Sequence, residues 1–418
     1  MNTSIFNVDI INISCLFSNI EIVKMMKLSA LLPLPLPLPL PLILLVAFNS
    51  AANVAVNPIF QLEAKPEIGE MVTSSNAELC EVAKGSVDYL NLGEDYDPGI
   101  ITAGITAQFG GDLDRVKRTL NFICQVEQED KLAGTKSRLM DADFIAEHFD
   151  VIRWMPDKNQ AQGFAKDKPL LKNIPDDKIL LTKYYIKLAK GTARQTPETP
   201  YALYAIPNDE KDLTLEQANA DPSLTRHQLT KQDVITGILD KDKLAQPMVW
   251  LSRYDLEDSL MQGTVKVDFT TDKSTSGDIS GNNSDDRSEI TSQFFNVHRN
   301  NGIGYKRNLK KEQQGRYWYF KKTESVMGYG KDANYKIPVY PLVTVAGDLA
   351  HLGLGKLIML THNGESRLTV LADTGGAFEN NQYQLDYLGG YFKNWDDYIN
   401  TYRTFPDYFE ARILLLKE

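Results

Sequence analysis

The chain has 418 residues, of which 43% are hydrophobic and 24% are charged, and its formal net charge is -10 at pH 7. This composition is typical of a globular protein, and the length suffices for two or three domains. The acidic balance argues against a nucleic-acid-binding protein, which needs a basic surface, and against electrostatic docking on anionic lipids.

The first 52 residues have the features of an export signal. A positive start around Lys27 precedes an apolar run at 28–48 and small residues that suit a signal peptidase, so we expect cleavage after about Ala52. Met25 or the next methionine is then the better start of translation. The alternative is a retained membrane anchor, which the Pro-Leu repeat disfavours because each proline removes a helix hydrogen bond.

No cysteine directly follows the apolar run, so we expect no lipid attachment there. The sequence thus predicts an exported protein, periplasmic or secreted, and leaves open an association with the cell wall or the outer membrane. Cys80 and Cys124 remain after cleavage. In an exported chain this pair suits a disulfide, and two buried free thiols fit the sequence equally well.

Helical patterns dominate residues 77–150. Apolar residues recur at spacings of three and four over 112–128, which predicts an amphipathic helix, and residues 141–149 predict another with an acidic first turn. Whether these helices cover one side of a catalytic domain or bind a partner stays open.

Strands and short helices alternate in the rest of the chain. The long polar stretch at about 270–290 predicts a mobile loop. Short helices are expected at 212–220 and 230–241, and strands are expected at 179–188, 201–206, 248–252, 264–269, 316–320 and 412–416.

Three aspartates, Asp348, Asp373 and Asp386, each combine a short apolar strand with a nearby glycine turn. Gly375 and Gly376 follow Asp373 and give the backbone freedom for a sharp turn. Rigidly held carboxyl groups of this kind suit acid–base chemistry. An isolated Asp-Thr-Gly-Gly is more often only a turn, and the third aspartate favours the functional interpretation.

These aspartates resemble the signature of the 3D domain, a double-psi β-barrel of enzymes that cut peptidoglycan glycan strands. The resemblance extends to the murein lytic transglycosylase A family over about residues 170–418. Four further segments resemble that family's motifs in the same order: Thr182-Lys-Tyr-Tyr185, residues 224–237, Met261-Gln262-Gly263-Thr264 and Asn300-Asn-Gly-Ile-Gly-Tyr305.

The resemblance implies a mainly β fold with some α structure. Residues 166–190 and 317–418 would form a double-psi β-barrel catalytic domain, and residues 191–316 an inserted small β domain that carries the mobile loop. Residues 53–165 would be an N-terminal helical extension. A deep groove between the two domains would bring Tyr185 and Asp386 to face Gln262.

It also implies a reaction. A lytic transglycosylase cleaves the β-1,4 bond between N-acetylmuramic acid and N-acetylglucosamine without water and leaves a 1,6-anhydro end. One residue acts as acid and then as base, which needs a raised pKa. By resemblance Asp386 is this residue, Asp373 shapes the site and Asp348 is structural. The implied substrate-binding residues are Thr182, Tyr184, Tyr185, Gln262, Gly263, Tyr305, Gly375 and Gly376.

Some positions depart from the family pattern. Lys183 and Val265 stand where the family has glycines, and Ala377-Phe-Glu-Asn380 replaces Ile-Lys-Gly. One alternative is therefore a non-catalytic peptidoglycan-binding or scaffold protein whose N-terminal helices contact a cell-wall assembly protein. Another is an ordinary glycosidase that uses both aspartates and water. We expect no metal and no cofactor, because His351 and His362 lie on separate turns and no nucleotide-binding motif is present.

Overall fold

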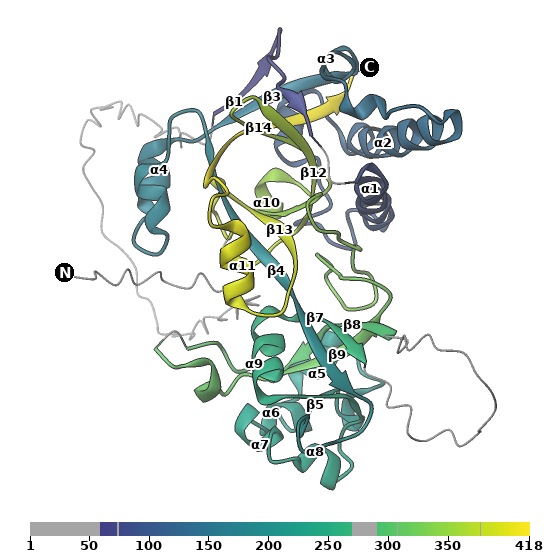
Figure 1. The fold of residues 1–418 in the computed structure, drawn as a ribbon, viewed down its shortest axis with the longest axis vertical. Helices are drawn as coiled ribbons and strands as arrows, with labels where there is room; N and C mark the ends of the chain where they lie inside the picture. The colour runs from purple at the N-terminus through teal and green to yellow at the C-terminus, as the bar shows by residue number, and fades with distance from the viewer. Residues whose placement is uncertain (1–58, 73–74, 270–290, 307, 377) are drawn as a thin grey trace, which may run out of the picture.

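A computed structural model describes residues 59–72, 75–269, 291–306, 308–376 and 378–418. The expected export signal and the expected loop at 270–290 lie outside these ranges. Within them, no helix has the length and apolar character that crossing a membrane requires. The fold mixes helices with one large mixed sheet (Figure 1).

The N-terminal part contains both helices and strands. The predicted amphipathic helix begins after Asp112, whose carboxylate accepts a hydrogen bond from the Arg115 amide, and ends at Gly134 in the left-handed conformation. The elements are β1 (Ile59–Glu63), β2 (Glu70–Met71), α1 (Asn76–Leu90), α2 (Leu113–Ala133), α3 (Ala142–His148) and β3 (Phe149–Met155). These strands were not predicted, and they join the sheet, because β3 pairs with β1 and β14 and β2 pairs with β12.

Six strands close into a barrel. They are β4 (Ile179–Thr192), β10 (Thr344–Ala346), β11 (Leu357–His362), β12 (Glu365–Asp373), β13 (Gln384–Phe392) and β14 (Tyr408–Leu416). The pairing runs β14-β11-β12-β10-β13-β4, and β4 returns to β14 through Tyr408 opposite Leu180. The pairs β10–β12 and β13–β4 are parallel, and the other four are antiparallel.

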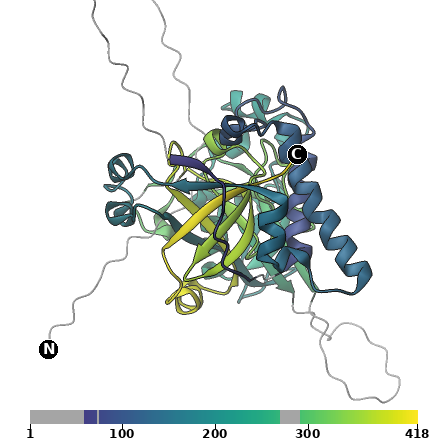
Figure 2. The ribbon, with the colours of Figure 1, turned by 90° about the horizontal axis from the view of Figure 1, so that it is seen from above.

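Helices surround this barrel on several sides. They include α4 (Lys158–Gly163), α10 (Leu349–Leu352) and α11 (Trp395–Tyr402). Figure 2 shows the N-terminal helices, in purple to blue, along one side of the barrel. Their buried residues, such as Val82 and Leu120, belong to the same hydrophobic core as barrel residues such as Ile358. A disulfide joins Cys80 of α1 to Cys124 of α2, with the two Cα atoms 4.8 Å apart.

A second lobe has its own hydrophobic core. Its strands are β5 (Tyr201–Tyr204), β6 (Pro247–Leu251), β7 (Thr264–Phe269), β8 (Thr291–Asn300) and β9 (Trp318–Thr323). Its helices are α5 (Leu215–Ala220), α6 (Thr225–Gln228), α7 (Lys231–Val234), α8 (Ile238–Lys241) and α9 (Arg253–Gln262). The helix predicted at 230–241 is therefore two helices, separated by Gly237 in the left-handed conformation.

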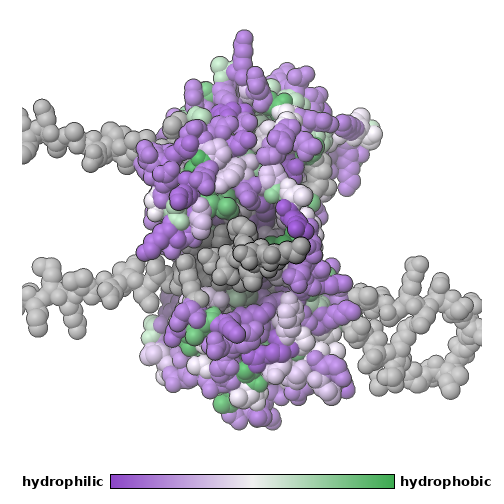
Figure 3. Space-filling view, turned by 60° about the vertical axis from the view of Figure 1, so that its left-hand side comes forward, coloured by the Kyte–Doolittle hydropathy of each residue, from purple (hydrophilic) through white to green (hydrophobic). Residues whose placement is uncertain are grey.

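Strand β4 runs through both lobes (Figure 1). Its first half pairs with β13, and its last residues pair with β7 and β6 of the second lobe. The second lobe also includes β9, because residues 317–320 pack in its core, so it extends beyond the expected boundary at 316. Figure 3 shows a largely hydrophilic surface on both lobes.

Candidate active site

The strand register brings two of the three aspartates together. Ala346 of β10 pairs with Asp373 of β12 on one side and with Asp386 of β13 on the other. A bulge between Leu371 and Asp373 sets the first of these pairings. Paired residues on neighbouring strands point to the same face, so the two carboxyl groups lie on either side of a small alanine side chain.

Asp386 is buried, with 2% of its surface exposed. The pKa of its carboxyl is raised to about 7, because burial and the charge of Asp373 raise it more than Thr182, Lys168 and Lys183 lower it. Its Oδ1 has no hydrogen-bond partner within the described part of the chain. A carboxyl that is readily protonated near neutral pH and has one oxygen without a hydrogen-bond partner is suited to proton donation.

The Asp373 side chain is less buried than that of Asp386, and both of its carboxylate oxygens accept hydrogen bonds. Its Oδ2 accepts a hydrogen bond from the Tyr184 hydroxyl at 2.9 Å, and its Oδ1 accepts one from the Thr374 amide at 2.9 Å. Burial raises its pKa to about 6, and these two hydrogen bonds together with Lys336 limit the rise. Burial of Asp386 beside a second carboxylate therefore favours its protonated form, and the two hydrogen bonds to Asp373 favour the ionised form of Asp373.

The two tyrosines of β4 have different partners. Tyr184 contacts Asp373, and burial beside this carboxylate holds the pKa of the tyrosine well above its ordinary value, so it stays a donor. Tyr185 stacks on Tyr398 of α11 at 4.9 Å, and its hydroxyl is hydrogen-bonded to Gln262 of the second lobe. The structure thus brings Tyr185 of β4 and Gln262 of α9 into contact.

Thr182 lies directly beside Asp386 in the β4–β13 register. Its hydroxyl accepts a hydrogen bond from Gln384 Nε2 at 2.7 Å, and Gln384 Oε1 in turn accepts from Lys168 at 2.9 Å. The next residue of β4, Lys183, is paired with Asp407 at 3.0 Å. Its ammonium group is therefore held outside the carboxyl pair.

Gly263 and Tyr305 belong to the second lobe and have packing roles. Gly263 ends α9 with φ +76°, and a Cβ there would lie 2.2 Å from the Trp318 ring. The Arg316 guanidinium lies over the rings of both Tyr305 and Trp318, at 5.1 and 4.5 Å. These contacts connect Tyr305 to Gly263 and hence to the end of α9.

The glycine turn after Asp373 and the turn at Asp348 lie next to the carboxyl pair and are joined to each other by a hydrogen bond. The Gly375 carbonyl accepts a hydrogen bond from the Phe378 amide at 3.0 Å, which forms the turn that includes Gly376. Asp348 caps α10 and contacts His351 Nδ1 at 2.8 Å. The neighbouring Gly347 carbonyl accepts a hydrogen bond from the Thr374 hydroxyl at 2.7 Å, so the Asp348 turn is tied to the Asp373 turn.

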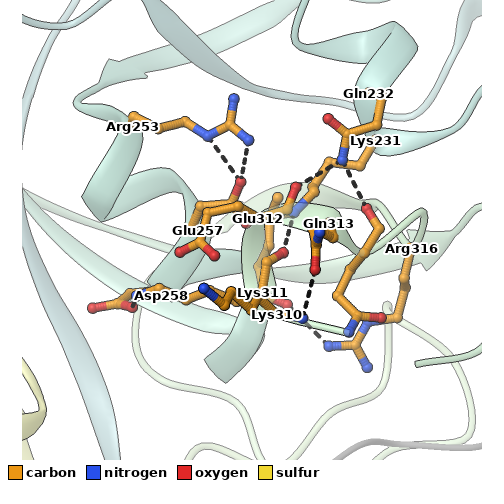
Figure 4. Close-up of polar contacts among 12 residues, drawn as sticks. Lys231, Gln232, Arg253, Glu257, Asp258, Lys310, Lys311, Glu312, Gln313 and Arg316 are labelled. Atoms are coloured by element: carbon orange, nitrogen blue, oxygen red, sulfur yellow. Dashed lines mark hydrogen bonds and ion pairs between the residues drawn. The ribbon is translucent and has the colours of Figure 1, made fainter. Parts of the chain in front are cut away.

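Helix α9 of the second lobe carries two neighbouring acidic residues, Glu257 and Asp258 (Figure 4). Glu257 contacts Lys231 and Arg253, and Asp258 contacts Lys311 at 2.8 Å. Lys231 and Gln232 also donate to backbone carbonyls of residues 311–314. The segment that carries Lys311 is therefore fastened to α7 and α9.

Three more aromatic residues lie in this region, and of these the sequence indicated only Trp395 as an available aromatic platform. Tyr398 is buried, donates to the Lys183 carbonyl at 2.7 Å and is electrostatically coupled to Asp386. Tyr254 of α9 remains 48% exposed and Trp395 of α11 41% exposed. Only the spacing of Trp395 and Tyr398 on one helical turn could have indicated that they belong together.

A surface cavity or a cluster of metal-binding side chains could indicate a site apart from the predicted site residues. A surface cavity of about 520 Å³ lies in the second lobe between β6, β8 and β9 and contains none of the predicted site residues. Among the described residues, no cluster of three or more His, Cys, Asp or Glu side chains could hold a metal ion.

No family model matches the chain, and no curated protein matches it. Solved structures of murein lytic transglycosylases are similar to it at low sequence identity. Escherichia coli MltA with bound chitohexaose is 17% identical, with 87% of this chain and 96% of that chain covered and a TM-score of 0.49. Neisseria gonorrhoeae MltA is 14% identical, with coverage of 84% and 96% and a TM-score of 0.48. The membrane-bound lytic murein transglycosylase of Agrobacterium tumefaciens is 14% identical, with coverage of 73% and 85% and a TM-score of 0.45.

Proposed function

We propose that this protein is a peptidoglycan lytic transglycosylase. It would cleave the β-1,4 bond between N-acetylmuramic acid and N-acetylglucosamine without water and leave a 1,6-anhydro end. The observation that carries the proposal is the carboxyl pair on either side of Ala346, in which Asp386 has a pKa raised to about 7 and an unpartnered Oδ1. One carboxyl that is readily protonated and readily deprotonated fits a reaction with a single acid–base residue.

In the proposed mechanism, Asp386 first donates its proton to the glycosidic oxygen, and the bond from this oxygen to C1 of the muramoyl sugar breaks. The Asp386 carboxylate then removes the proton of the C6 hydroxyl of the same sugar. The C6 oxygen bonds to C1 and closes the anhydro ring, so Asp386 ends protonated and no water is consumed. The ionised Asp373 stabilises positive charge that develops at C1 and favours the protonated form of Asp386.

The proposal includes the finer assignments of the fold. The closed six-stranded barrel is assigned double-psi topology as the catalytic domain, the second lobe including β9 is its insert, and residues 53–165 are an N-terminal extension. Glycan would bind in a groove between the lobes, where Tyr185 reaches Gln262. Export to the periplasm or beyond, directed by residues 1–52, would bring the enzyme to its polymer.

We also assign a sugar platform to Tyr254. Lys187 and Lys311 both lie over its ring, at 4.8 and 4.6 Å, and both contact the Asp258 carboxylate, at 3.6 and 2.8 Å. Tyr254 is 48% exposed, and an exposed aromatic ring is suited to stacking against the apolar face of a sugar ring. The partly exposed ring of Trp395 is a second candidate platform.

The test is mass spectrometry of the soluble products from isolated peptidoglycan. Wild-type protein should release anhydro-muropeptides, Asp386→Asn should release none, and Asp348→Asn should still release them. If Asp373→Asn releases no products while Asp386→Asn still releases them, the acid–base role belongs to Asp373. Reducing ends in place of anhydro ends would make the protein a hydrolase. If wild-type protein pellets with the sacculus but releases nothing, it is a binding or scaffold protein.

A further inference from the structure

A hairpin of residues 326–339 contacts three parts of the molecule. Its two arms are joined by hydrogen bonds from the Gly328 amide to the Ile337 carbonyl at 2.8 Å and from the Val339 amide to the Val326 carbonyl at 3.0 Å. On the second lobe, Lys321 of β9 donates to Asn334 at 2.9 Å. No sequence motif marked this hairpin, and the proposed mechanism does not use it.

One side of the hairpin rests on the end of β12. The Tyr329 amide donates to the Ala372 carbonyl at 3.0 Å. A Cβ at Gly328 would lie 2.7 Å from that carbonyl oxygen and 3.3 Å from the Asp373 Cβ. There is no space for a side chain between the two backbones, so a shift of the hairpin must displace Asp373 or leave a gap beside it.

The hairpin also brings a charge to Asp373. The Lys336 ammonium lowers the pKa of the Asp373 carboxyl against the effect of burial. The other groups that face this carboxyl are the Tyr184 hydroxyl of β4, the Thr374 amide and the Asp386 carboxyl of β13.

The opposite side of the hairpin is fastened to the N-terminal part of the chain. Asp97 Oδ2 accepts hydrogen bonds from both the Tyr89 and the Tyr329 hydroxyl, each at 2.8 Å. The Tyr89 hydroxyl in turn accepts one from the Lys331 amide at 3.0 Å. Asp97 is 9% exposed and Tyr89 is 3% exposed, so these bonds are protected from water. A second contact joins Tyr96 to Asp332 at 2.7 Å.

We propose that Asp97 is a positioning residue for the carboxyl pair. By holding Tyr329 it fixes the 326–339 hairpin, with Gly328 and Lys336, against Asp373, and the N-terminal segment thereby sets the geometry in which Asp373 and Asp386 face each other. Its effect on turnover rests on the proposed function, whereas its effect on Asp373 does not.

The experiment compares the wild type with Tyr329→Phe, which removes only one hydroxyl from the Asp97 contact, and with Lys336→Gln. Tyr317→Phe is the matched control, because it removes a buried hydroxyl that donates to the Ala202 carbonyl at 3.2 Å in the core of the second lobe. The readout is the titration of the Asp373 carboxyl, followed by carbon-13 NMR. We expect its pKa to rise by up to about one unit in Lys336→Gln and by less in Tyr329→Phe, and to stay unchanged in the control.

Turnover on peptidoglycan gives a second readout. An ionised Asp373 is needed, so the acidic limb of the pH profile should move to higher pH in Lys336→Gln and Tyr329→Phe, with kcat three- to tenfold lower and KM little changed. Lys336→Arg should restore both values. An unchanged Asp373 titration in folded Tyr329→Phe would overturn the inference, whatever the result for Lys336→Gln. If the wild type makes no anhydro products, the proposed function fails, and the titration still decides the inference.

Discussion

Asp386 is an ionisable side chain in a place where its charge is unfavourable. It is 2% exposed, one of its oxygens lacks a partner among the described residues, and a second carboxylate lies on the next strand but one. These conditions raise its pKa from 3.8 to about 7. The folded protein therefore binds a proton that the unfolded chain releases, and this difference must appear in the stability.

Asp386→Asn should accordingly stabilise the protein at pH 8, by up to about 4 kcal/mol. Above the folded pKa of about 7 the wild type carries the full cost of the raised pKa, and below the unfolded value near 4 it carries none. The difference in Tm between variant and wild type should thus shrink as the pH falls from 7 to 4. A difference that does not vary with pH would contradict the assignment of this pKa.

A second prediction for a single residue concerns the contribution of Tyr254 to substrate binding. In an inactive Asp386→Asn background, Tyr254→Ala should weaken binding of N-acetylglucosamine oligomers about tenfold, the loss expected for one stacked ring. Tyr254→Phe keeps the ring and is the matched control, and it should bind almost as well as the parent. Calorimetric titration measures both, and equal affinity of all three proteins would remove Tyr254 from the binding site.

At the scale of elements, the junction of α9 and β7 depends on one glycine. Gly263 has φ +76° and lies against the Trp318 ring, so a side chain there meets both backbone strain and a clash. Gly263→Ala should destabilise the protein by about 2 to 4 kcal/mol, measured by urea unfolding. Gly134→Ala is the control, because Gly134 also ends a helix with positive φ but has open space around it.

Gly134→Ala should cost only about 1 kcal/mol, the strain of a left-handed alanine. Equal losses in the two variants would mean that Trp318 moves aside without cost. Binding of glycan should also fall in Gly263→Ala, because Gln262 precedes this glycine and its side chain meets Tyr185.

Local sequence patterns predicted some elements well. The helix at 112–128 corresponds to α2, and the strand at 264–269 coincides with β7, because in both cases the apolar spacing follows the burial. Strands β1 and β3 were missed, since their pairing partners lie far away in the sequence: β3 pairs with β14 and with β1. Strand β4 continues to Thr192 for the same reason, because β7 pairs with its last residues.

At the scale of the whole molecule, the candidate site depends on strand order. The sequence indicated Asp373 and Asp386, but the alanine between them comes from β10, and only the pairing of three strands brings these residues together. Asp97 and Lys336 could not be predicted, because neither lies in a motif and their effect passes through a hairpin contact. Long-range packing, which a single sequence does not display, decides both features.

The disulfide acts at this largest scale. Cys80 and Cys124 are 44 residues apart and join two helices that pack on the barrel core. The loop that they close contains Tyr89, Tyr96 and Asp97, the residues that hold the hairpin. Cross-linking lowers the entropy of the unfolded chain, so its loss should cost about 2 to 4 kcal/mol.

The reduced wild type should therefore melt at a lower temperature than the oxidised protein. The double variant Cys80→Ala, Cys124→Ala should melt near the reduced protein and show no response to reductant. Thiol titration of the unfolded, unreduced wild type distinguishes the alternative of two free cysteines, because it should find no reactive thiol at either position. If oxidised and reduced proteins melt together, α1 and α2 are held by packing alone, and the N-terminal segment would keep Asp97 in place without the cross-link.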